Sequence, residues 1–562
     1  MGESIIQAKS SALEPHRTVA SRVTGNMNHI NAREVTNAED LLAEIGYKQE
    51  LKRTYTTFQV FGVAFSIMGL LPSIATVLAT GLVTGPVGLI WGWFAVGFFI
   101  LAVGIAMAEL ASAIPTSGGL YYWTYYYAPP KYKAFLSFMI GITNSLGLAG
   151  GVCSITYGFA QQLLTAVYFG LDGDFDITNY TVFGVYAAGI AAELLVTCMS
   201  TKSSAKLQSL SIICNVGLIN LFLIALPIGT KVNSHFNDAK FIFGKFENTS
   251  DWPSGWAFFQ FGFMPAIWTI GAFDSTVHMA EESKTPSRSI PIGIIASITA
   301  CWLGGFIICI VICACMSTDI NEIVNTATGQ PLMFIIYSNM GKKWAVAFSA
   351  LTAFCQFLMG ASTLTAISRQ VWAFARDDGL PFSNWTKYVD KKLQVPINAS
   401  VTSAIASLLL GLLMLAGPVA ANALFSISVI CGNVAYATPQ VLRFTSGKHL
   451  FTPGVFYIGK ILSPINMVIT TLYQVFVIIF AMFPDSISVG GASEMNYAVV
   501  INCGLWILGA IYFVVYKHKS YHGPKSNLED DNVDSFDDVS FHEGEAVDQS
   551  SSDNAITKGD NI

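Results

Sequence analysis

Long uncharged apolar runs, rather than alternating hydrophobic and polar positions, dominate the chain between residues 57 and 516. A helix crosses the roughly 30 Å hydrocarbon core of a bilayer with about 20 such residues. Charged residues or clusters of Gly, Pro and Asn separate the runs. We therefore predict twelve membrane helices, at residues 57–82, 87–112, 134–169, 181–200, 207–229, 256–280, 291–316, 343–375, 396–416, 420–441, 461–483 and 496–516.

The composition agrees with this pattern. Hydrophobic residues make up 53% of the 562 positions, charged residues make up 12%, and the mean hydropathy is +0.53. Soluble domains carry about 25% charged residues. The net charge of −6 arises in the tail from Lys517 to Ile562, where acidic residues far outnumber lysines. We predict an all-α polytopic membrane protein, surrounded by membrane lipid and without a nucleic-acid partner.

The distribution of charge predicts the orientation. Residues 1–53 are polar and contain no early apolar core of the kind found in a signal peptide, which places the N-terminus in the cytosol. With twelve helices the C-terminus is cytoplasmic too, and most of the Lys and Arg then lie inside, as the positive-inside rule requires. The glycosylation motifs at Asn179 and Asn248 fall in predicted outer loops.

The cysteines offer no cofactor chemistry. All ten fall inside apolar segments, and none shows the paired spacing of a disulfide framework or a zinc site. We interpret them as small packing residues and expect neither a metal nor a cofactor.

The sixth predicted helix contains an unexpected carboxylate. From Trp256 to Val277 the only formal charge is Asp274. A charged residue at the centre of a membrane helix costs about 2.5–3.5 kcal/mol, so we expect Asp274 to face the interior of the bundle. His278 lies one turn later on the same helical face, where it either shares a proton with Asp274 or simply reaches the inner interface.

Two helices carry signals for an interruption within the membrane. The sixth contains Gly262, Pro265 and Gly271, and the first contains Gly69 and Pro72. Such residues often only kink or pack a membrane helix. Paired interruptions five helices apart, however, are typical of inverted-repeat transporters, whose half-helix N-termini bind anionic groups and whose freed carbonyls bind cations.

Three segments carry a family resemblance. They are "ELASAIPTSGGLYYWTYYYAP" (109–129), "IGAFDSTVHMAEESKTPSRSIPIGI" (270–294) and "SRQVWAFARDDGLPFSNW" (368–385). They resemble the amino acid/polyamine/organocation permeases over about residues 40–520. The segments "LLAEIGYKQELKR" (41–53) and "FCQFLMGAS" (354–362) are most similar to the fungal amino acid and choline branch, in particular to permeases for 4-aminobutyrate (GABA).

The resemblance implies a five-plus-five inverted repeat with discontinuous helices 1 and 6. The transport core would span 54–441, with repeats at 54–229 and 256–441, followed by two peripheral helices within 442–516. Residues 1–53 and 517–562 would be cytoplasmic tails. Such a protein is a secondary active transporter and not an enzyme, and it imports GABA or a related amino compound by alternating access, with a proton as the coupling ion.

The resemblance also implies a substrate site. The substrate carboxylate would meet backbone amides around Ser66, Ile67, Met68 and Gly69, and its amino group would meet carbonyls around Trp268, Thr269, Ile270 and Gly271. Trp268 aligns with an aromatic lid, although a packed core tryptophan is the alternative. Asp274 matches an acidic position with a role in gating and proton coupling, against the alternative of a hydrogen-bonded brace.

Further polar residues are candidates for gating. Glu109 begins a loop that helps to close the cytoplasmic side in the family, with a solvated helix end as the alternative. Arg369 and Arg376 share a helix face and either pair with Glu281, Glu282 or Asp377, or are solvated. Two intramembrane polar residues complete the candidates: Asn215, where many members carry a lysine, which leaves the coupling ion open, and Glu193, which no motif explains.

Several alternatives stay open at this stage. A choline or polyamine (putrescine) permease would have the same fold, and so would a nutrient sensor. An intramembrane enzyme using Asp274 and His278 would need a motif such as HExxH or GxSxG, and neither accompanies this pair. The resemblance leaves the plasma membrane and the vacuolar membrane as locations, with the tails as regulatory candidates.

Overall fold

The computed structural model describes residues 38–488 and 496–526. The predictions for residues 1–37 and 527–562 lie outside the described residues. Within the described residues every named element is helical, and the only β-bridge pairs Tyr55 with Ser283. The predicted all-α class is confirmed.

Eleven helical segments of the described chain are long and apolar enough to cross a membrane. Their ends agree with the predicted spans to within a few residues for most helices. They are α3 (Thr57–Met68) with α4 (Leu70–Leu82), α5 (Gly85–Ala113), α7 (Lys133–Gly170), α8 (Asn179–Thr197), α9 (Thr201–Asn233), α14 (Pro286–Cys315), α17 (Lys342–Arg376), α19 (Ile397–Gly411) with η3 (Leu412–Ala416), α20 (Pro418–Phe444), α21 (Leu462–Phe480) and α22 (Tyr497–Val515).

The sixth predicted span is not one continuous helix. It consists of α11 (Ser254–Ala257), the π-helical turn η1 (Phe258–Gly262) and α12 (Phe263–Thr269). The chain then leaves the helical conformation through residues 270–274 and resumes in α13 (Ser275–His278) and η2 (Ala280–Glu282). Ala272 adopts a φ of 53°, which a non-glycine residue rarely adopts, and this residue reverses the helical winding.

The break follows Gly271 and does not occur at Gly262 or Pro265. Gly262 allows close packing against α5 instead. A Cβ on the facing Gly92 would lie only 2.3 Å from the Gly262 carbonyl oxygen. Pro265 lies inside the continuous helical stretch of residues 254–269, which continues past this residue without a break. The first helix breaks at one residue, Gly69, with φ 38° and ψ 64°.

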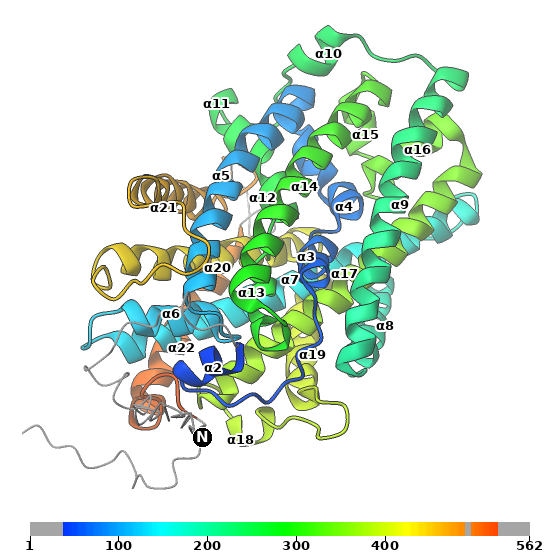
Figure 1. Cartoon of the computed structure of the whole chain (residues 1–562). Helices are drawn as coiled ribbons and strands as arrows, with labels where there is room; N and C mark the ends of the chain where they lie inside the picture. The colour runs from blue at the N-terminus through cyan, green and yellow to red at the C-terminus, as the bar shows by residue number, and fades with distance from the viewer. Residues whose placement is uncertain (1–37, 489–495, 527–562) are drawn as a thin grey trace, which may run out of the picture.

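The interrupted helices form the centre of the bundle. In the most apolar window of residues 57–82, 89% of the positions are buried, against 28% for α21 and 22% for α22. The pairs α7–α17 and α5–α14 make the most extensive helix contacts around them. Figure 1 shows α21 at one edge of this bundle and α8 and α9 at the other. The spans α21 and α22 are therefore the least buried of the eleven in the described chain.

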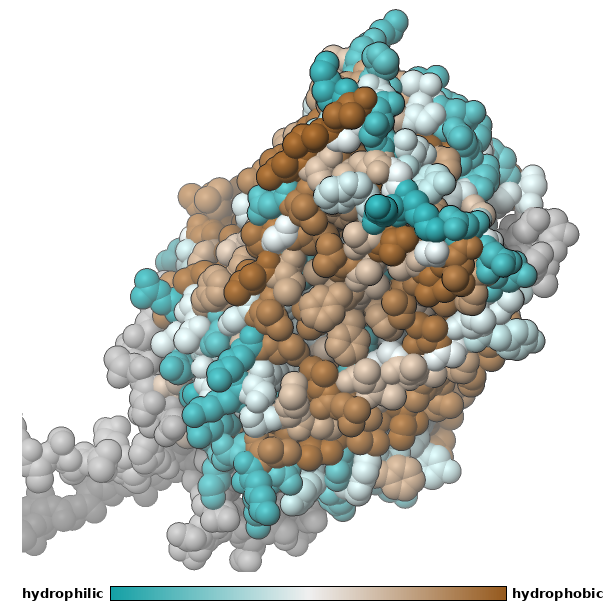
Figure 2. Space-filling view, turned by 90° about the vertical axis from the view of Figure 1, so that its right-hand side faces the viewer, coloured by the Kyte–Doolittle hydropathy of each residue, from teal (hydrophilic) through white to brown (hydrophobic). Residues whose placement is uncertain are grey.

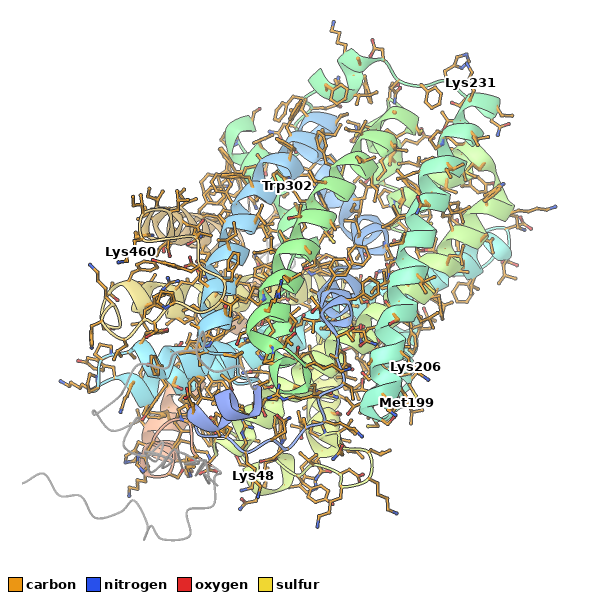
Figure 3. The ribbon with its side chains drawn as sticks, viewed as in Figure 1. Lys48, Met199, Lys206, Lys231, Trp302 and Lys460 are labelled. Carbon is orange, nitrogen blue, oxygen red and sulfur yellow. The ribbon has the colours of Figure 1, made fainter. Side chains whose placement is uncertain are left out.

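The short helices divide the molecule into two faces. The first face, called the α2 face, carries α2 (Ala38–Glu44), α6 (Gly119–Tyr127) and α18 (Ser383–Thr386). The opposite, α10 face carries α10 (Ala239–Gly244), α15 (Ile320–Val324) and α16 (Pro331–Met340), as Figure 1 shows. Figure 3 places Lys206 and Lys231 near opposite ends of α9, so this helix extends from one face to the other.

Apolar side chains cover the surface between the two faces. Figure 2 shows a broad hydrophobic area over the middle of one side of the molecule, with hydrophilic residues gathered towards its ends. Exposed side chains of the outer helices include Leu195, Ile213 and Leu472, at 75%, 68% and 68%. Burying such side chains in hydrocarbon is favourable and exposing them to water is not. The protein is an integral multi-pass membrane protein.

Candidate functional site: a central cavity at the two helix breaks

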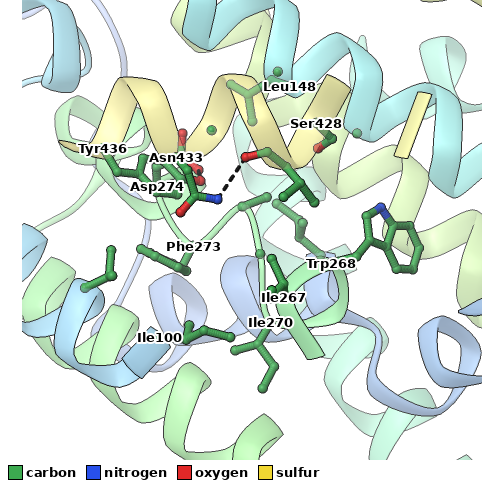
Figure 4. Close-up of a pocket in the computed structure, with 18 of the residues that line it drawn as sticks. Ile100, Leu148, Ile267, Trp268, Ile270, Phe273, Asp274, Ser428, Asn433 and Tyr436 are labelled. Atoms are coloured by element: carbon green, nitrogen blue, oxygen red, sulfur yellow. Dashed lines mark hydrogen bonds between the residues drawn. The ribbon is translucent and has the colours of Figure 1, made fainter. Parts of the chain in front are cut away.

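A cavity lies where the two interrupted helices meet α7 and α20. It contains about 740 Å³ of space not filled by protein atoms, some of it open to solvent. Its wall is mostly apolar. The side chains that can form hydrogen bonds in it are Asn144, Trp268, Asp274, Ser428, Asn433, Tyr436 and Tyr473. Figure 4 shows Asp274 beside Asn433 and Tyr436 at one end of the cavity and Trp268 at the other.

The break in the sixth helix leaves carbonyl oxygens without partners. The Ile270 amide still donates to Ala266 at 2.8 Å, but within the described residues no hydrogen bond reaches the carbonyls of residues 268–271. Gly271 permits this arrangement, because a Cβ there would lie 3.0 Å from the Trp268 oxygen. Of the four residues predicted for this role, Trp268, Ile270 and Gly271 line the cavity, and Thr269 does not.

The break in the first helix offers amides one residue later than predicted. Ser66, Ile67 and Met68 form the last turn of α3, and the Gly69 amide donates to the Phe65 carbonyl at 3.1 Å. The first amides without an intrahelical acceptor are those of Leu70 and Leu71, which begin α4. Among the four predicted residues, Ile67 lines the cavity.

Asp274 is buried, as predicted, and three helices meet at its carboxylate. The residue is 1% exposed. Tyr436 of α20 donates to Oδ1 at 2.7 Å, and the Asn144 amide of α7 donates to Oδ2 at 3.1 Å. Sequence reasoning missed both partners, whose only signal was a polar residue within an apolar span. The predicted neighbour His278 lies with Nε2 at 3.3 Å from Oδ2.

The surroundings of His278 define where protons lie. Its Nδ1 is 3.0 Å from the backbone carbonyl of Ser117, and a carbonyl only accepts, so Nδ1 carries a proton. Nε2 has two polar neighbours, the Asp274 Oδ2 at 3.3 Å and the Asn144 amide nitrogen at 3.5 Å. The imidazole, the carboxylate and the amide therefore form one buried polar cluster beside the helix break.

Trp268 separates the cavity from a second hollow on the α10 side. The ring is 9% exposed and lines both spaces. Its Nε1 donates to the Ser154 hydroxyl at 3.3 Å, and its ring centroid lies 4.9 Å from that of Phe425. This position is compatible with the predicted lid and with the packed core tryptophan, so the lid stays a prediction.

Buried ion pairs connect the helices on the α2 side of the cavity. Arg369 donates to Glu282 at 2.7 Å, and Arg376 donates to Glu281 through two nitrogens at 3.0 and 3.1 Å. The predicted pairing of both arginines is confirmed, and the solvated alternative is wrong. Removing one partner of a buried ion pair leaves an uncompensated buried charge, which is costly. These contacts therefore hold α17 against the sixth helix.

Glu109 belongs to a separate cluster and is not a solvated helix end. It is 1% exposed and accepts from Arg443 at 2.5 Å, from the Ser463 hydroxyl at 2.6 Å and from the Ile458 amide at 3.0 Å. The carboxylate therefore joins α5 to α20 and α21. Sequence reasoning missed Arg443, which lies far from Glu109 in the chain.

Asp377 lies directly after α17 and connects, through hydrogen bonds, the segments that close the α2 face. It accepts from the hydroxyls of Tyr47 at 2.9 Å and Tyr121 at 2.7 Å and from the Lys525 amide at 3.2 Å. Burial raises the pKa of the Asp377 carboxyl to about 6, although the adjacent Arg376 opposes the shift. The Arg376 guanidinium lies 3.8 Å from the centroid of the Tyr47 ring.

The segment before the first membrane helix takes part in this closure. The short helix α2 ends at Glu44, and Gly46 follows with a φ of 101°. The segment after it contains no helix, and its side chains Tyr47, Leu51 and Tyr55 are buried. At its end, the Tyr55 and Thr54 amides donate to the Glu282 carbonyl at 3.0 and 2.9 Å. The N-terminal segment is thus bound to the second half of the sixth helix.

Two intramembrane candidates lie outside the cavity lining. Asn215 is buried in α9 and donates to the Ser211 carbonyl at 2.9 Å, while its Oδ1 has no partner within the described residues. Glu193 in α8 is also buried and accepts from the Thr156 hydroxyl at 3.0 Å. It packs so closely against Gly360 that a Cβ there would overlap the carboxylate.

Comparisons with known proteins agree with this geometry. A family model described as amino acid permease matches residues 55–505. The GABA-specific permease of Saccharomyces cerevisiae is 54% identical over 517 residues, which cover 92% of this chain and 90% of that protein. An uncharacterised amino-acid permease of Schizosaccharomyces pombe is 34% identical over 89% of this chain and 91% of its own length.

A protein of Candida albicans proposed to be a polyamine transporter is 32% identical over 91% of this chain and 92% of its own length. The matched region contains both helix breaks, the central cavity and the ion pairs on the α2 side. The chain therefore belongs to the amino acid permease family and is a membrane transporter, not an enzyme.

Proposed function

We propose that this permease imports GABA, or a related compound with an ammonium and a carboxylate at the two ends of a short chain. The observation that carries the proposal is the 54% identity to the GABA-specific permease, which extends over 92% of the chain. Fold alone would not identify a substrate. The family match over residues 55–505 covers the residues that line the cavity as well as the scaffold.

The two helix breaks supply complementary groups for such a substrate. The unpaired carbonyls of residues 268–271 are suited to accept hydrogen bonds from an ammonium group. The N-terminal end of α4, with the free amides of Leu70 and Leu71, is suited to a carboxylate. We infer that the carboxylate-binding turn predicted at Ser66–Gly69 acts through these two amides.

We infer that a proton is the coupling ion and that Asp274 and His278 hold it. The support is their geometry: Nε2 lies 3.3 Å from Oδ2, close enough for a proton to pass between the two side chains. Asp274 also lines the cavity, so a bound ammonium would alter the affinity of this carboxylate for a proton. Asn215 offers no fixed charge that would compete with this role.

We further infer that transport proceeds by alternating access between the two faces. The α2 face would be cytosolic, as the predicted orientation of the tails implies, and the ion pairs of Arg369, Arg376 and Glu109 would form its gate. Trp268 would be the lid on the α10 side. The plasma membrane and the vacuolar membrane both suit this orientation.

The test is uptake of radiolabelled GABA into liposomes that contain the purified full chain. We expect accumulation that depends on an inward proton gradient and that unlabelled GABA blocks. Unlabelled putrescine, choline and several α-amino acids serve as competitors. The proposal fails if GABA is not taken up, or if α-amino acids displace it more effectively than GABA analogues do.

A polyamine substrate is the second candidate, because the relative in Candida albicans bears that assignment. A diamine such as putrescine has no carboxylate and would leave the amides of Leu70 and Leu71 unpaired, which disfavours its binding. Choline, which also lacks a carboxylate, is disfavoured on the same ground. Strong competition by putrescine would move the substrate class to amines.

A further inference from the structure

One turn of α20 faces the end of the unwound segment of the sixth helix. Asn433 and Tyr436 lie one turn apart on the same side of α20, and both line the central cavity. The Tyr436 hydroxyl donates to Asp274 at 2.7 Å, and its ring centroid lies 5.1 Å from that of Phe273. Figure 4 shows Asn433 beside Asp274 at this end of the cavity. This turn of α20 therefore forms a wall opposite the helix break.

The side chain of Asn433 presents an oxygen to the cavity. Its Nδ2 donates to the Val429 carbonyl at 2.8 Å, and since a carbonyl only accepts, the nitrogen must be the atom that faces Val429. Oδ1 is then an acceptor of fixed orientation, and no hydrogen bond reaches it from residues 38–488 and 496–526. The residue is 9% exposed and borders the cavity, so a partner for Oδ1 has to come from that space.

The charges and rings of the cavity lining favour a cation. Among the described residues of the lining, Asp274 alone has a formal charge, and none is a Lys or Arg. The rings of Phe273, Tyr436 and Tyr473 belong to the same lining, and the face of an aromatic ring attracts an ammonium group. Tyr473 comes from α21 and stacks on Phe99 of α5, with ring centroids 5.4 Å apart. The lining as a whole therefore suits an alkylammonium group.

The position of Asn433 bears on how far apart the two charged ends of a substrate lie. In an α-amino acid the ammonium and the carboxylate are attached to one carbon, so a carboxylate at the start of α4 holds both groups near the first helix break. In an ω-amino acid such as GABA, methylene groups carry the ammonium away from that break. An ammonium has three N–H donors, so it can bind a freed carbonyl of residues 268–271 and Oδ1 of Asn433 together.

We propose that Asn433 is a specificity-determining residue, whose Oδ1 binds the ammonium group of an ω-amino acid and so selects these compounds over α-amino acids. Water that occupies this place in the empty transporter is displaced by the ammonium, because a charged donor makes the stronger hydrogen bond. The inference rests on the proposed function for the place of the carboxylate. The acceptor rests only on the geometry of Asn433 and its neighbours.

The test compares three ligands that differ only in their amine, and it needs no transport. They are GABA, its isomer α-aminobutyrate, whose amine is next to the carboxylate, and butyrate, which has no amine. Their Kd values are measured by titration calorimetry on the purified full chain in detergent. Asn433→Leu removes the acceptor at similar volume. We expect it to raise the Kd for GABA by at least about tenfold, because a hydrogen bond to a charged group is lost. The Kd values for α-aminobutyrate and butyrate should stay unchanged.

Two further variants separate the acceptor from the stability of the helix. Asn220 of α9 donates to the Val216 carbonyl at 2.8 Å, which is the same bond within a helix, but it is exposed and lies outside the cavity lining. Asn220→Leu should leave all three Kd values unchanged. Asn433→Ala also removes the acceptor and adds no new atoms, so it provides the same comparison if Asn433→Leu does not fold.

The outcomes distinguish this inference from the proposed function. A preference for GABA over its isomer that depends on Asn433, without GABA uptake into liposomes, would refute only the proposed function. GABA uptake together with an unchanged preference in Asn433→Leu and Asn433→Ala would overturn only the role of Asn433. Equal losses of affinity for GABA and α-aminobutyrate would overturn it too, because Asn433 would then not select by the position of the amine.

Discussion

Replacing Asp274 by asparagine tests how the proton is coupled, and the structure indicates what the change costs. The amide oxygen can keep the hydrogen bond from Tyr436, now 2.7 Å long, and the new amide nitrogen can donate to Nε2 of His278. The new amide nitrogen cannot accept the hydrogen bond that Asn144 now donates to Oδ2, because both groups would then be donors. Leaving one buried donor unpaired costs about 1–3 kcal/mol, so the variant should fold but lose thermal stability.

Asparagine cannot carry the proposed coupling proton, because an amide does not titrate and Nδ1 of His278 already donates to Ser117. One coupled proton across a gradient of two pH units supplies about 2.7 kcal/mol, enough for roughly 100-fold accumulation. Asp274→Asn should exchange labelled for unlabelled GABA across liposomes and yet accumulate none, with the membrane potential held at zero.

Glu193→Gln is the matched control, because it removes a buried carboxylate that does not line the cavity. It should keep gradient-driven accumulation. Undiminished accumulation in Asp274→Asn at every pH would refute the assignment of the proton to the Asp274–His278 pair. Loss of accumulation in Glu193→Gln alone would move the coupling site to α8.

Three further predictions follow from the breaks and the α2 face. Opening that face would return the pKa of Asp377 from about 6 towards its ordinary value near 4, so the closed state binds more protons than the open state. Closure should therefore strengthen as the pH on this side falls from 7 to 5. Asp377→Asn should abolish that pH dependence in thiol-accessibility assays. Gly69→Ala should lower the thermal midpoint and the rate of uptake, because residue 69 has a positive φ and a Cβ would lie 2.6 Å from the Met359 sulfur. Arg376→Gln and Glu281→Gln should each destabilise by about 3–5 kcal/mol, and the double variant by clearly less than their sum, in a thermal double-mutant cycle.

Each of these has a result that contradicts it. An acid dependence that persists in Asp377→Asn would assign closure to another group. Gly170→Ala, at the end of α7 where a Cβ meets no atom within 4 Å, should be tolerated, and equal damage from both alanines would refute the packing argument. Additive effects of Arg376→Gln and Glu281→Gln would show that their ion pair does not stabilise the protein.

The sequence by itself determined the class of protein and the course of most of its helices. Membrane spans are long, local and uniformly apolar, so the predicted ends agree with those of α5, α7 and α17 to within two residues. The burial of Asp274 was predictable for the same reason, since an isolated carboxylate in hydrocarbon is too costly. The family also came from contiguous motifs, above all the stretch that contains Asp274 and His278.

Only the tertiary structure decided which groups meet. Tyr436, Asn144 and Ser117 lie on three different elements, yet they determine the hydrogen bonding of Asp274 and His278. The position of the break in the sixth helix could not be predicted from the sequence either. Gly262 and Pro265 are helix-breaking residues just as Gly271 is. Packing against α5 uses Gly262 for close approach, whereas residues 270–274 unwind beside a cavity that only the assembled bundle creates. A linear pattern records how hydrophobic each segment is, but not which of its faces another helix covers.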